Sequence, residues 1–265
     1  MTVSSDGTVG KALDVLDRVA AYGRPVRFGT LLEDSTFPKA TLYRLLQTLT
    51  SQNMLEYNPD HQTYSPGVRL VRLAHAAWSQ SSLAPIARPW LDKLSADIGH
   101  TVHLAQLDNA QVLYVDKRNA AQPIEMFSDA GKVGPAYCTG VGKAMLAYLG
   151  PDELQHALGQ QSFHRFTEHT YTDVESLSRE LTAIRARGYA FDREEHEPQI
   201  ICIAVPILSG QGRVLGGLSI TGSTRMLTLD ALVELSPRLQ ATAIAIAAEA
   251  EAWRFPDTQF RKTGT

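Results

Sequence analysis

Apolar residues recur at helical spacing in two stretches near the start of the chain. The first predicts a helix over residues 9–22, which Gly23 ends, because glycine readily takes the left-handed conformation that follows a helix. The second predicts a helix over residues 37–52, and a short apolar segment at residues 28–32 lies between the two. The predicted apolar stripes are Val9, Leu13, Leu16 and Ala20 in the first helix and Leu42, Leu45, Leu46 and Leu49 in the second.

Local signals mark the start of the second helix and the elements that follow it. Thr36 is of a type that caps helix N-termini, and Pro38 is expected in the first turn, where its missing N–H costs no hydrogen bond. Residues 54–57 and 62–64 are predicted to form two short strands around an Asn-Pro-Asp turn. A helix, a short helix, a helix and a hairpin, in this order, are typical of a winged helix-turn-helix.

The rest of the chain mixes helices and strands. A helix over residues 68–79 leads to Gln80, Ser81 and Ser82, which we expect to be a hinge. Beyond it, adjacent strands joined by short polar turns indicate an antiparallel sheet flanked by helices, so the predicted fold class is α+β. The predicted helices cover residues 85–98, 140–149, 173–187 (capped by Asp173 and ended by Gly188) and 229–252, and the strands cover residues 102–107, 112–115, 200–208 and 214–221.

These patterns divide the chain into three parts. We expect a winged helix-turn-helix domain over residues 1–67, a linker helix over residues 68–82 and a second domain over residues 83–265. The 265-residue length is ample for two domains, each with its own core.

Composition adds little beyond the globular class. The chain is 44% hydrophobic and 20% charged, which is typical of a folded protein, and its formal net charge of −3 lacks the strong basic excess that would alone indicate nucleic acid. Residues 1–82 hold eight Lys and Arg against seven Asp and Glu, and the remainder holds seventeen against twenty-one. This weak local excess is compatible with DNA binding but is not evidence for it.

The two cysteines, Cys138 and Cys202, are too few for a disulfide framework. The sequence shows neither a basic segment followed by an apolar leader nor an apolar run long enough to cross a bilayer. We therefore expect a cytoplasmic protein with reduced thiols and no membrane partner.

The second helix is small, polar and basic on the face opposite its leucines. A winged helix-turn-helix places such a face in a major groove about 12 Å wide. Ala40 lets the backbone come close, Arg44 can reach guanine or a phosphate, and Gln47 can reach adenine. A solvated helix face explains the same periodicity, and the hairpin that follows is what favours DNA binding. The candidate DNA-binding residues are Lys39, Ala40, Thr41, Tyr43, Arg44 and Gln47.

Two segments of this region resemble the IclR family of bacterial transcription regulators. They are residues 10–16 (Gly-Lys-Ala-Leu-Asp-Val-Leu) and residues 39–49 (Lys-Ala-Thr-Leu-Tyr-Arg-Leu-Leu-Gln-Thr-Leu). The family typically shows Pro-Lys-Ser/Thr-Thr running into Arg-Leu-Leu. Here Ala40 takes the usual Ser/Thr place, which implies the loss of one polar contact. Residues 28–32 also depart from the family's Leu-x-Glu-Ile/Leu-Ala pattern.

The resemblance continues through the second half of the chain. It rests on residues 137–144 (Tyr-Cys-Thr-Gly-Val-Gly-Lys-Ala), residues 191–198 (Phe-Asp-Arg-Glu-Glu-His-Glu-Pro) with residues 201–207, and residues 218–222. It implies a GAF-like antiparallel-sheet domain that binds a small metabolite, often a carboxylate. Carried over by position, the implied effector-binding residues are Gly140, Val141, Asp192, Cys202, Ser219 and Thr221, with Met126 as an apolar wall.

The residues themselves are compatible with such a pocket. Thr139 can cap the helix that follows it, where glycines let a ligand approach N–H groups and the helix dipole favours an anion. Ser219 and Thr221 lie two apart on a predicted strand, so their hydroxyls share a face. Tight packing explains the glycines equally well, a charge run such as residues 192–195 is usually a solvated surface, and Cys202 in an apolar strand is ordinarily inert.

Our main hypothesis is a regulator that binds double-stranded operator DNA as a homodimer or a dimer of dimers and responds to a small-molecule effector. It includes no catalytic residue, metal or cofactor. A thiol- or metal-dependent enzyme with an N-terminal interaction module is the alternative from another class. A third possibility is a regulator that answers to a protein partner, which a pocket filled by its own side chains would favour. Within the enzyme alternative, the candidate zinc ligands are His100, His103, His196, Asp192 and Cys202.

Overall fold

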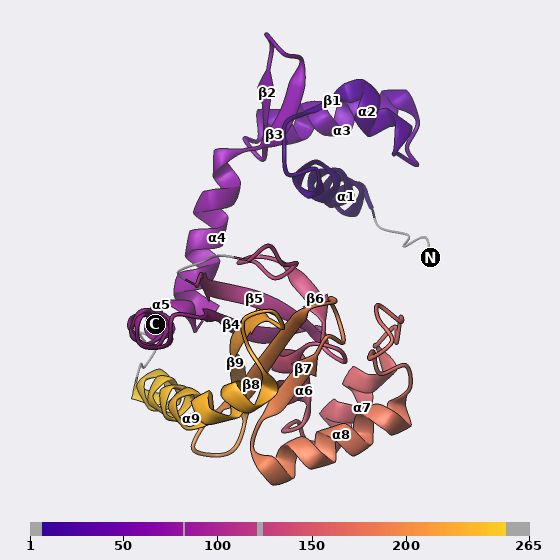
Figure 1. Ribbon diagram of the computed structural model, residues 1–265. Coiled ribbons are helices and arrows are strands. Elements are labelled where there is room, and N and C mark those ends of the chain that lie inside the picture. Colours follow the sequence, from indigo (N-terminus) through magenta and orange to yellow (C-terminus); the bar gives the residue numbers. More distant parts are fainter. Residues whose placement is uncertain (1–6, 82, 121–123, 253–265) are drawn as a thin grey trace, which may run out of the picture. The chain divides into compact units, whose positions relative to one another are not determined.

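The structure is a computed structural model that describes residues 7–81, 83–120 and 124–252. It divides into two compact units, residues 1–81 and residues 82–265 (Figure 1). The division falls at the predicted hinge, yet helix α4 (Val68–Ser81) runs through most of it. Gln80 and Ser81 are therefore helical, and Ser82 lies outside the described residues.

The first unit combines helices with a three-stranded antiparallel sheet of order β1-β3-β2. Strands β2 and β3 form a hairpin that projects from the helices as a wing (Figure 1). In chain order, the elements before α4 are α1 (Thr8–Ala21), β1 (Val26–Arg27), α2 (Phe28–Glu33), α3 (Lys39–Ser51), β2 (Leu55–Asn58) and β3 (Thr63–Pro66).

The core of this unit uses the predicted stripe of α3 but a different face of α1. All four predicted leucines of α3 are buried. On α1, by contrast, Val9 is 74% exposed and Leu13 is 49% exposed, so of the predicted stripe only Leu16 is buried. The residues of α1 that do pack inward are Val15, Leu16 and Val19. Both sets follow the 3.6-residue period of a helix, so the apolar pattern alone did not decide which face of α1 is buried.

The predicted cap of α3 is wrong as well. The helix begins at Lys39 with Pro38 at the N-cap position, and no side chain caps it. A proline disfavours the helical conformation in the residue before it, so Phe37 stays outside the helix. The Phe37 N–H instead donates a hydrogen bond of 3.0 Å to the hydroxyl of Ser35, two residues before it. Gly23 follows α1 at a φ of +61°, which confirms the predicted end of that helix.

The second unit is built on a six-stranded antiparallel sheet of order β6-β5-β4-β9-β8-β7. The sequence did not predict β6, α7 and β7, because these elements are short and lack a clear apolar period. Its elements in chain order are α5 (Ala84–Ile98), β4 (Thr101–Asp108), β5 (Gln111–Arg118), β6 (Val133–Pro135), α6 (Gly140–Leu146), α7 (Pro151–Gly159), α8 (Val174–Arg187), β7 (Ala190–Arg193), β8 (Ile200–Leu208), β9 (Val214–Ser223) and α9 (Leu229–Ala252).

Helices cover both faces of this sheet. On one face α5 and α9 pack against β4, β8 and β9 in a core rich in leucine and isoleucine. On the other face α6 and α8 form a second core with smaller residues. Helix α8 has both of its predicted ends: the Asp173 carboxylate accepts a hydrogen bond of 2.7 Å from the Ser176 N–H, and Gly188 follows at a φ of +83°. Local capping chemistry therefore specified this helix fully.

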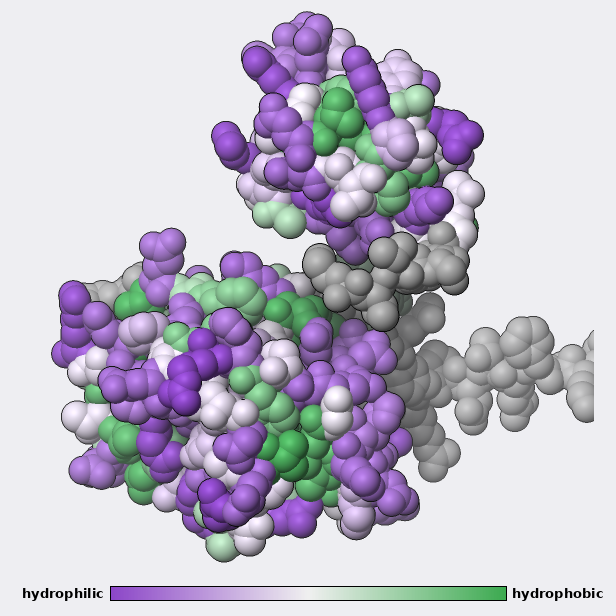
Figure 2. Space-filling model, turned by 90° about the vertical axis from the view of Figure 1, so that its right-hand side faces the viewer, coloured by the Kyte–Doolittle hydropathy of each residue, from purple (hydrophilic) through white to green (hydrophobic). Residues whose placement is uncertain are grey.

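The face drawn in Figure 2 is mainly hydrophilic, and its hydrophobic residues form small patches among hydrophilic ones. None of the helices within the described residues combines the length and the apolar character that crossing a membrane requires.

Candidate DNA-binding face and ligand cavity

The polar face of α3 is exposed because the leucines on its other side hold the helix to the core. Arg44 and Gln47 are exposed, Tyr43 is 50% exposed, and Thr41 is half-buried. The Gln47 side-chain amide donates a hydrogen bond of 2.7 Å to the Tyr43 hydroxyl. These two side chains, one helical turn apart, are thus oriented together before any partner arrives.

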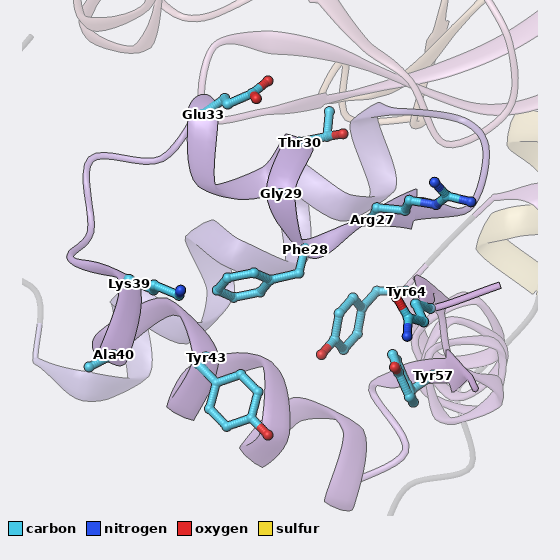
Figure 3. Close-up of a pocket in the computed structure, with 11 residues that line it drawn as sticks. Arg27, Phe28, Gly29, Thr30, Glu33, Lys39, Ala40, Tyr43, Tyr57 and Tyr64 are labelled. Atoms are coloured by element: carbon cyan, nitrogen blue, oxygen red, sulfur yellow. The ribbon is translucent and has the colours of Figure 1, made fainter. Parts of the chain in front are cut away.

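A groove with a volume of about 910 Å³ lies between α3, α2 and the wing (Figure 3). Lys39, Ala40 and Tyr43 line it, whereas Thr41 and the exposed residues farther along α3 lie outside its lining. The other lining residues are Arg27, Phe28, Gly29, Thr30, Glu33, Tyr57, Gln62 and Tyr64.

Aromatic rings form much of this groove. Phe28 meets Tyr43 edge to face, with 6.0 Å between ring centroids, and the cross-strand neighbours Tyr57 and Tyr64 are 4.9 Å apart. Figure 3 shows the cationic side chains of Arg27 and Lys39 on opposite sides of Phe28. The sequence analysis missed Arg27 and Tyr57 because only tertiary folding brings β1 and the wing beside α3.

In the second unit, strand register brings three of the implied effector-binding residues into one row. Asp192 of β7 pairs with Cys202 of β8, which pairs with Thr221 of β9. Directly paired residues on antiparallel neighbours point to the same face. Ser219, two residues before Thr221, shares that face and pairs with His103 of β4.

These side chains line a cavity of about 30 Å³ together with Gly140 and Val141 of α6. Six of the seven implied residues therefore lie together. Met126 does not line the cavity, and the next residue, Phe127, does, so the apolar wall differs from the expected one by one position. The lining residues that the sequence analysis did not assign to an effector are His103, Tyr114, Phe127, Ser128, Thr139, His196, Glu197 and Ile200.

His103 connects the two sides of this cavity. Its Nδ1 lies 3.2 Å from the Thr221 hydroxyl and 3.5 Å from the Ser219 hydroxyl, and its Nε2 lies 3.0 Å from the hydroxyl of Ser128. Burial, with the charge of Lys117, lowers the pKa of His103 to about 3. The ring is therefore neutral at physiological pH and fixes the orientation of three hydroxyl groups.

The start of α6 lies directly against the row of strand residues. A Cβ added to Gly140 would lie 2.3 Å from Sγ of Cys202, so only glycine fits there. Thr139 occupies the N-cap position, but its hydroxyl donates a hydrogen bond of 2.7 Å to the Pro135 carbonyl. The expected side-chain cap at Thr139 is thus wrong.

Asp192 is a buried acid, although it belongs to a run of charges that is usually solvated. Its Oδ1 accepts a hydrogen bond of 2.8 Å from the Glu195 N–H. Burial and the nearby charge of Glu195 raise the pKa of Asp192 to about 8. The side chain is therefore largely protonated at neutral pH and can donate a hydrogen bond.

A buried ion pair between Lys143 and Glu195 lies near Asp192. The Lys143 ammonium group on α6 contacts both carboxylate oxygens of Glu195 and lies 4.8 Å from the centre of the Tyr171 ring. The Lys143 and Glu195 side chains are 0% and 2% exposed. Burial raises the pKa of Glu195 despite its cationic partner. The Glu195 carbonyl also accepts a hydrogen bond of 2.6 Å from the Thr170 hydroxyl, so the segment around Glu195 is fixed from several sides.

Phe127 and Glu197 form one wall of the cavity. The Phe127 N–H donates to the two oxygens of Glu197 at 2.9 and 3.0 Å, and the Phe127 ring lies 5.0 Å from the ring of His196. Burial opposes ionisation of Glu197, but hydrogen bonds from His196 and the Phe127 N–H outweigh it and lower the pKa. Glu197 is therefore ionised, and its two hydrogen bonds hold the backbone of Phe127 in place.

Neither cysteine thiol in this unit is set up to react. Burial, reinforced by the charge of Asp192, raises the pKa of both cysteine thiols, which therefore stay protonated. Within the described residues, no three His, Cys, Asp or Glu side chains are arranged to hold a metal ion.

A two-unit protein with a winged helix-turn-helix and a small polar cavity in an antiparallel-sheet domain has the organisation of a ligand-responsive transcription regulator, and comparison with known proteins specifies the family. The model of the IclR helix-turn-helix domain matches residues 8–59, and the model of the C-terminal domain of IclR bacterial transcriptional regulators matches residues 75–248. The chain belongs to the IclR family, whose members pair a helix-turn-helix DNA-binding domain with an effector-binding C-terminal domain.

Similar proteins cover nearly the whole chain. The transcriptional regulator XynR of Escherichia coli is 30% identical over 239 residues, which are 90% of this chain and 95% of XynR. KdgR of the same species is 31% identical over 244 residues, 91% of this chain and 93% of KdgR.

Solved structures share the fold. The IclR of Thermotoga maritima superposes with a TM-score of 0.75 at 30% identity, covering 91% of this chain and 98% of that one. An IclR homologue from Microbacterium hydrocarbonoxydans, solved with 4-hydroxybenzoate, has a TM-score of 0.79 at 22% identity and covers 93% of this chain and all of its own. The predicted α+β fold and the family resemblance are confirmed.

Proposed function

We propose that this regulator acts in the cytoplasm, binds a specific operator through α3 and the groove beside it, and is controlled by a small carboxylate-containing metabolite in the cavity of the second unit. The observation that carries the effector half is the convergence of Gly140, Val141, Asp192, Cys202, Ser219 and Thr221 from four elements on one cavity.

The DNA-binding half rests on exposure and chemistry. Arg44 and Gln47 are exposed and can reach base edges, and the small side chain of Ala40 lets the backbone approach. Lys39 and Thr41, at the start of α3, suit phosphate contacts. The groove adds Arg27 as a further cation beside the wing. All six candidate DNA-binding residues remain our proposal for this interface.

A homodimer, or a dimer of dimers, is the assembly we propose. A pseudo-palindromic operator needs two recognition helices about 34 Å apart or a multiple of that spacing. Helix α4 offers apolar residues for self-association, because Val68 is 71% exposed and Val71 is 68% exposed one turn farther along. On α9, Ile244 is 70% exposed and offers a second such surface in the other unit.

The size of the cavity sets a condition on effector binding. A volume of about 30 Å³ has room for on the order of two water molecules, whereas ligand sites usually exceed about 300 Å³. A larger ligand therefore requires part of the cavity wall to move, and we propose that this part is the Phe127 segment, which the contacts of the Phe127 N–H hold to Glu197. The small volume also supports a second candidate, a regulator that answers to a protein partner; a screen in which no small molecule changes operator binding would favour it.

We propose no catalytic role for the second unit. A thiol-dependent enzyme needs an accessible thiolate, and both thiols here are buried and protonated. Metal analysis combined with thiol alkylation checks this, because stoichiometric zinc or one unusually reactive cysteine would revive the enzyme alternative.

The test is a gel-shift titration on the DNA upstream of the gene, at a stated near-physiological salt concentration. We expect a discrete complex at nanomolar protein that resists nonspecific competitor. Arg44→Ala should weaken it at least tenfold while leaving the far-UV circular dichroism spectrum unchanged, because the side chain is exposed. Arg213→Ala, an exposed arginine in the β8–β9 turn of the second unit, is the matched control and should bind as the parent does. Equal affinity of the Arg44 variant and the parent would refute the assignment of α3.

A further inference from the structure

Two polar groups in the cavity lack a protein partner. Asp192 uses Oδ1 to accept from the Glu195 N–H, and its Oδ2 makes no hydrogen bond to any residue that the structure describes. Tyr114 is only 5% exposed, and its hydroxyl likewise makes no hydrogen bond to any residue that the structure describes. Neither atom is among the fully buried side-chain atoms that lack a partner, so both are reached from the cavity, where a ligand's polar head can bond to them.

The cavity contains no side chain with a permanent positive charge to receive an anion. Its described lining includes neither lysine nor arginine, and His103 of β4 is neutral. Lys143 of α6 lies behind the cavity against Glu195, and this pair carries no net charge wherever its proton resides. The titratable and charged groups around Asp192 are Lys143 and Cys138 from around α6, Glu195, His196 and Glu197 from the segment after β7, Cys202 of β8, Tyr114 of β5 and His103 of β4.

These surroundings favour a protonated Asp192. Both Glu195 and Glu197 raise its pKa, Lys143 lowers it, and burial is the largest effect. A carboxylic acid differs from a carboxylate in being a hydrogen-bond donor, so Oδ2 can donate into the cavity, whereas both oxygens of the ionised Glu197 in the same wall already accept from the Phe127 N–H. The Tyr114 hydroxyl, whose pKa burial raises well above its usual value, is a second donor.

We propose that the effector's carboxylate is held by a proton that it shares with Oδ2 of Asp192, with the Tyr114 hydroxyl as the second donor. The inference rests on the proposed function of the cavity and adds the ionisation state in which the complex forms. No covalent bond changes: one proton lies between two carboxyl oxygens. The complex therefore contains one proton more than the ionised protein and the ionised ligand together.

The dimensions suit a head group. A cavity of about 30 Å³ has room for little more than the two oxygens of a carboxylate, and Val141 and Ile200 provide apolar walls beside them. The rest of a larger effector would occupy the space that the Phe127 ring fills.

The test uses three probes of one shape and different charge: propionate, propionamide and propionamidinium. Their affinities for the full chain are measured by isothermal titration calorimetry between pH 6 and pH 9.5. We expect propionate to bind best, with constant affinity below about pH 7 and a fall that approaches tenfold per pH unit above the pKa of about 8. Titration at pH 9 in two buffers of different ionisation enthalpy should show uptake of close to one proton.

The Asp192→Asn variant separates hydrogen-bond donation by residue 192 from its titration. An amide still donates a hydrogen bond but does not titrate, so the variant should bind propionate within about threefold of the parent at pH 6.5 and show no loss up to pH 9.5. Asp152→Asn on α7, an exposed matched control, should keep the pH dependence of the parent.

Three results would overturn the proposal: tighter binding of propionamidinium, affinity for propionate that rises with pH, or no binding of propionate at 50 mM. The gel shift keeps this failure distinct from that of the proposed function. A protein that still forms the discrete operator complex, but fails these tests, remains a regulator whose effector is bound by other chemistry.

Discussion

The buried contact between Lys143 and Glu195 gives the sharpest stability prediction. Replacing Lys143 by Met keeps the chain length and apolar stem but leaves Glu195, which is 2% exposed, without its counterion. Breaking a buried pair in this way costs about 3–5 kcal/mol, because the remaining charge is neither solvated nor compensated. Against a total stability of roughly 5–15 kcal/mol, such a loss is readily measured by urea unfolding of the second unit.

The pH dependence of this loss tests its cause. Without lysine, the folded-state pKa of Glu195 rises farther above its unfolded value, so the group favours folding only when protonated and stability falls as pH rises through that range. The deficit of Lys143→Met should therefore be smallest near pH 4.5 and largest near pH 8. Adding Glu195→Gln to Lys143→Met should recover at least about 2 kcal/mol of the loss at pH 8. A deficit under about 1 kcal/mol that is independent of pH would refute the reasoning.

Three further predictions concern packing and titration. Gly140→Ala places a Cβ 2.3 Å from the Cys202 sulfur and should cost about 1–3 kcal/mol in urea unfolding, and adding Cys202→Ala should recover most of it; no recovery would mean that the strain lies elsewhere. Leu46→Ala, at a fully buried position of α3, should destabilise the first unit by about 2–5 kcal/mol and weaken operator binding in gel shifts at 37 °C. Because the folded-state pKa of His103 is lowered to about 3, its contribution to stability is present above about pH 6.5 and lost on acidification; His103→Gln should flatten thermal melting temperatures between pH 6.5 and pH 4.

The sequence predicted elements with strong local signals well. Helix α8 is specified by Asp173 and Gly188, and the hairpin of β4 and β5 by a polar turn between apolar runs. The start of α3 was misplaced because two local rules compete at residues 36–38, and the effect of Pro38 on the residue before it prevailed. The stripe of α1 was misplaced because two faces share one period.

The cavity was predictable only through resemblance. Residue types alone indicated a solvated run around Asp192, and only strand pairing shows that its side chain shares a buried face with Cys202 and Thr221. His103 entered the sequence analysis only as a possible zinc ligand of the enzyme alternative, because its neutral, hydroxyl-bound state depends on burial that no local pattern encodes. Met126 was carried over by position from the resemblance, and its neighbour Phe127 lines the cavity instead, in a segment without regular secondary structure to fix the correspondence.

The register across β7, β8 and β9 bears on how the binding site can diverge. Strand pairing places Asp192, Cys202 and Thr221 side by side on one face of the sheet. Because the length of the β8–β9 turn does not set this pairing, insertions in the turn leave the three residues in place. A single-residue insertion within a strand would instead turn the following side chains to the opposite face. Ligand preference in descendants of this chain should therefore change by substitution at fixed row positions, while length variation accumulates only in the turns between them.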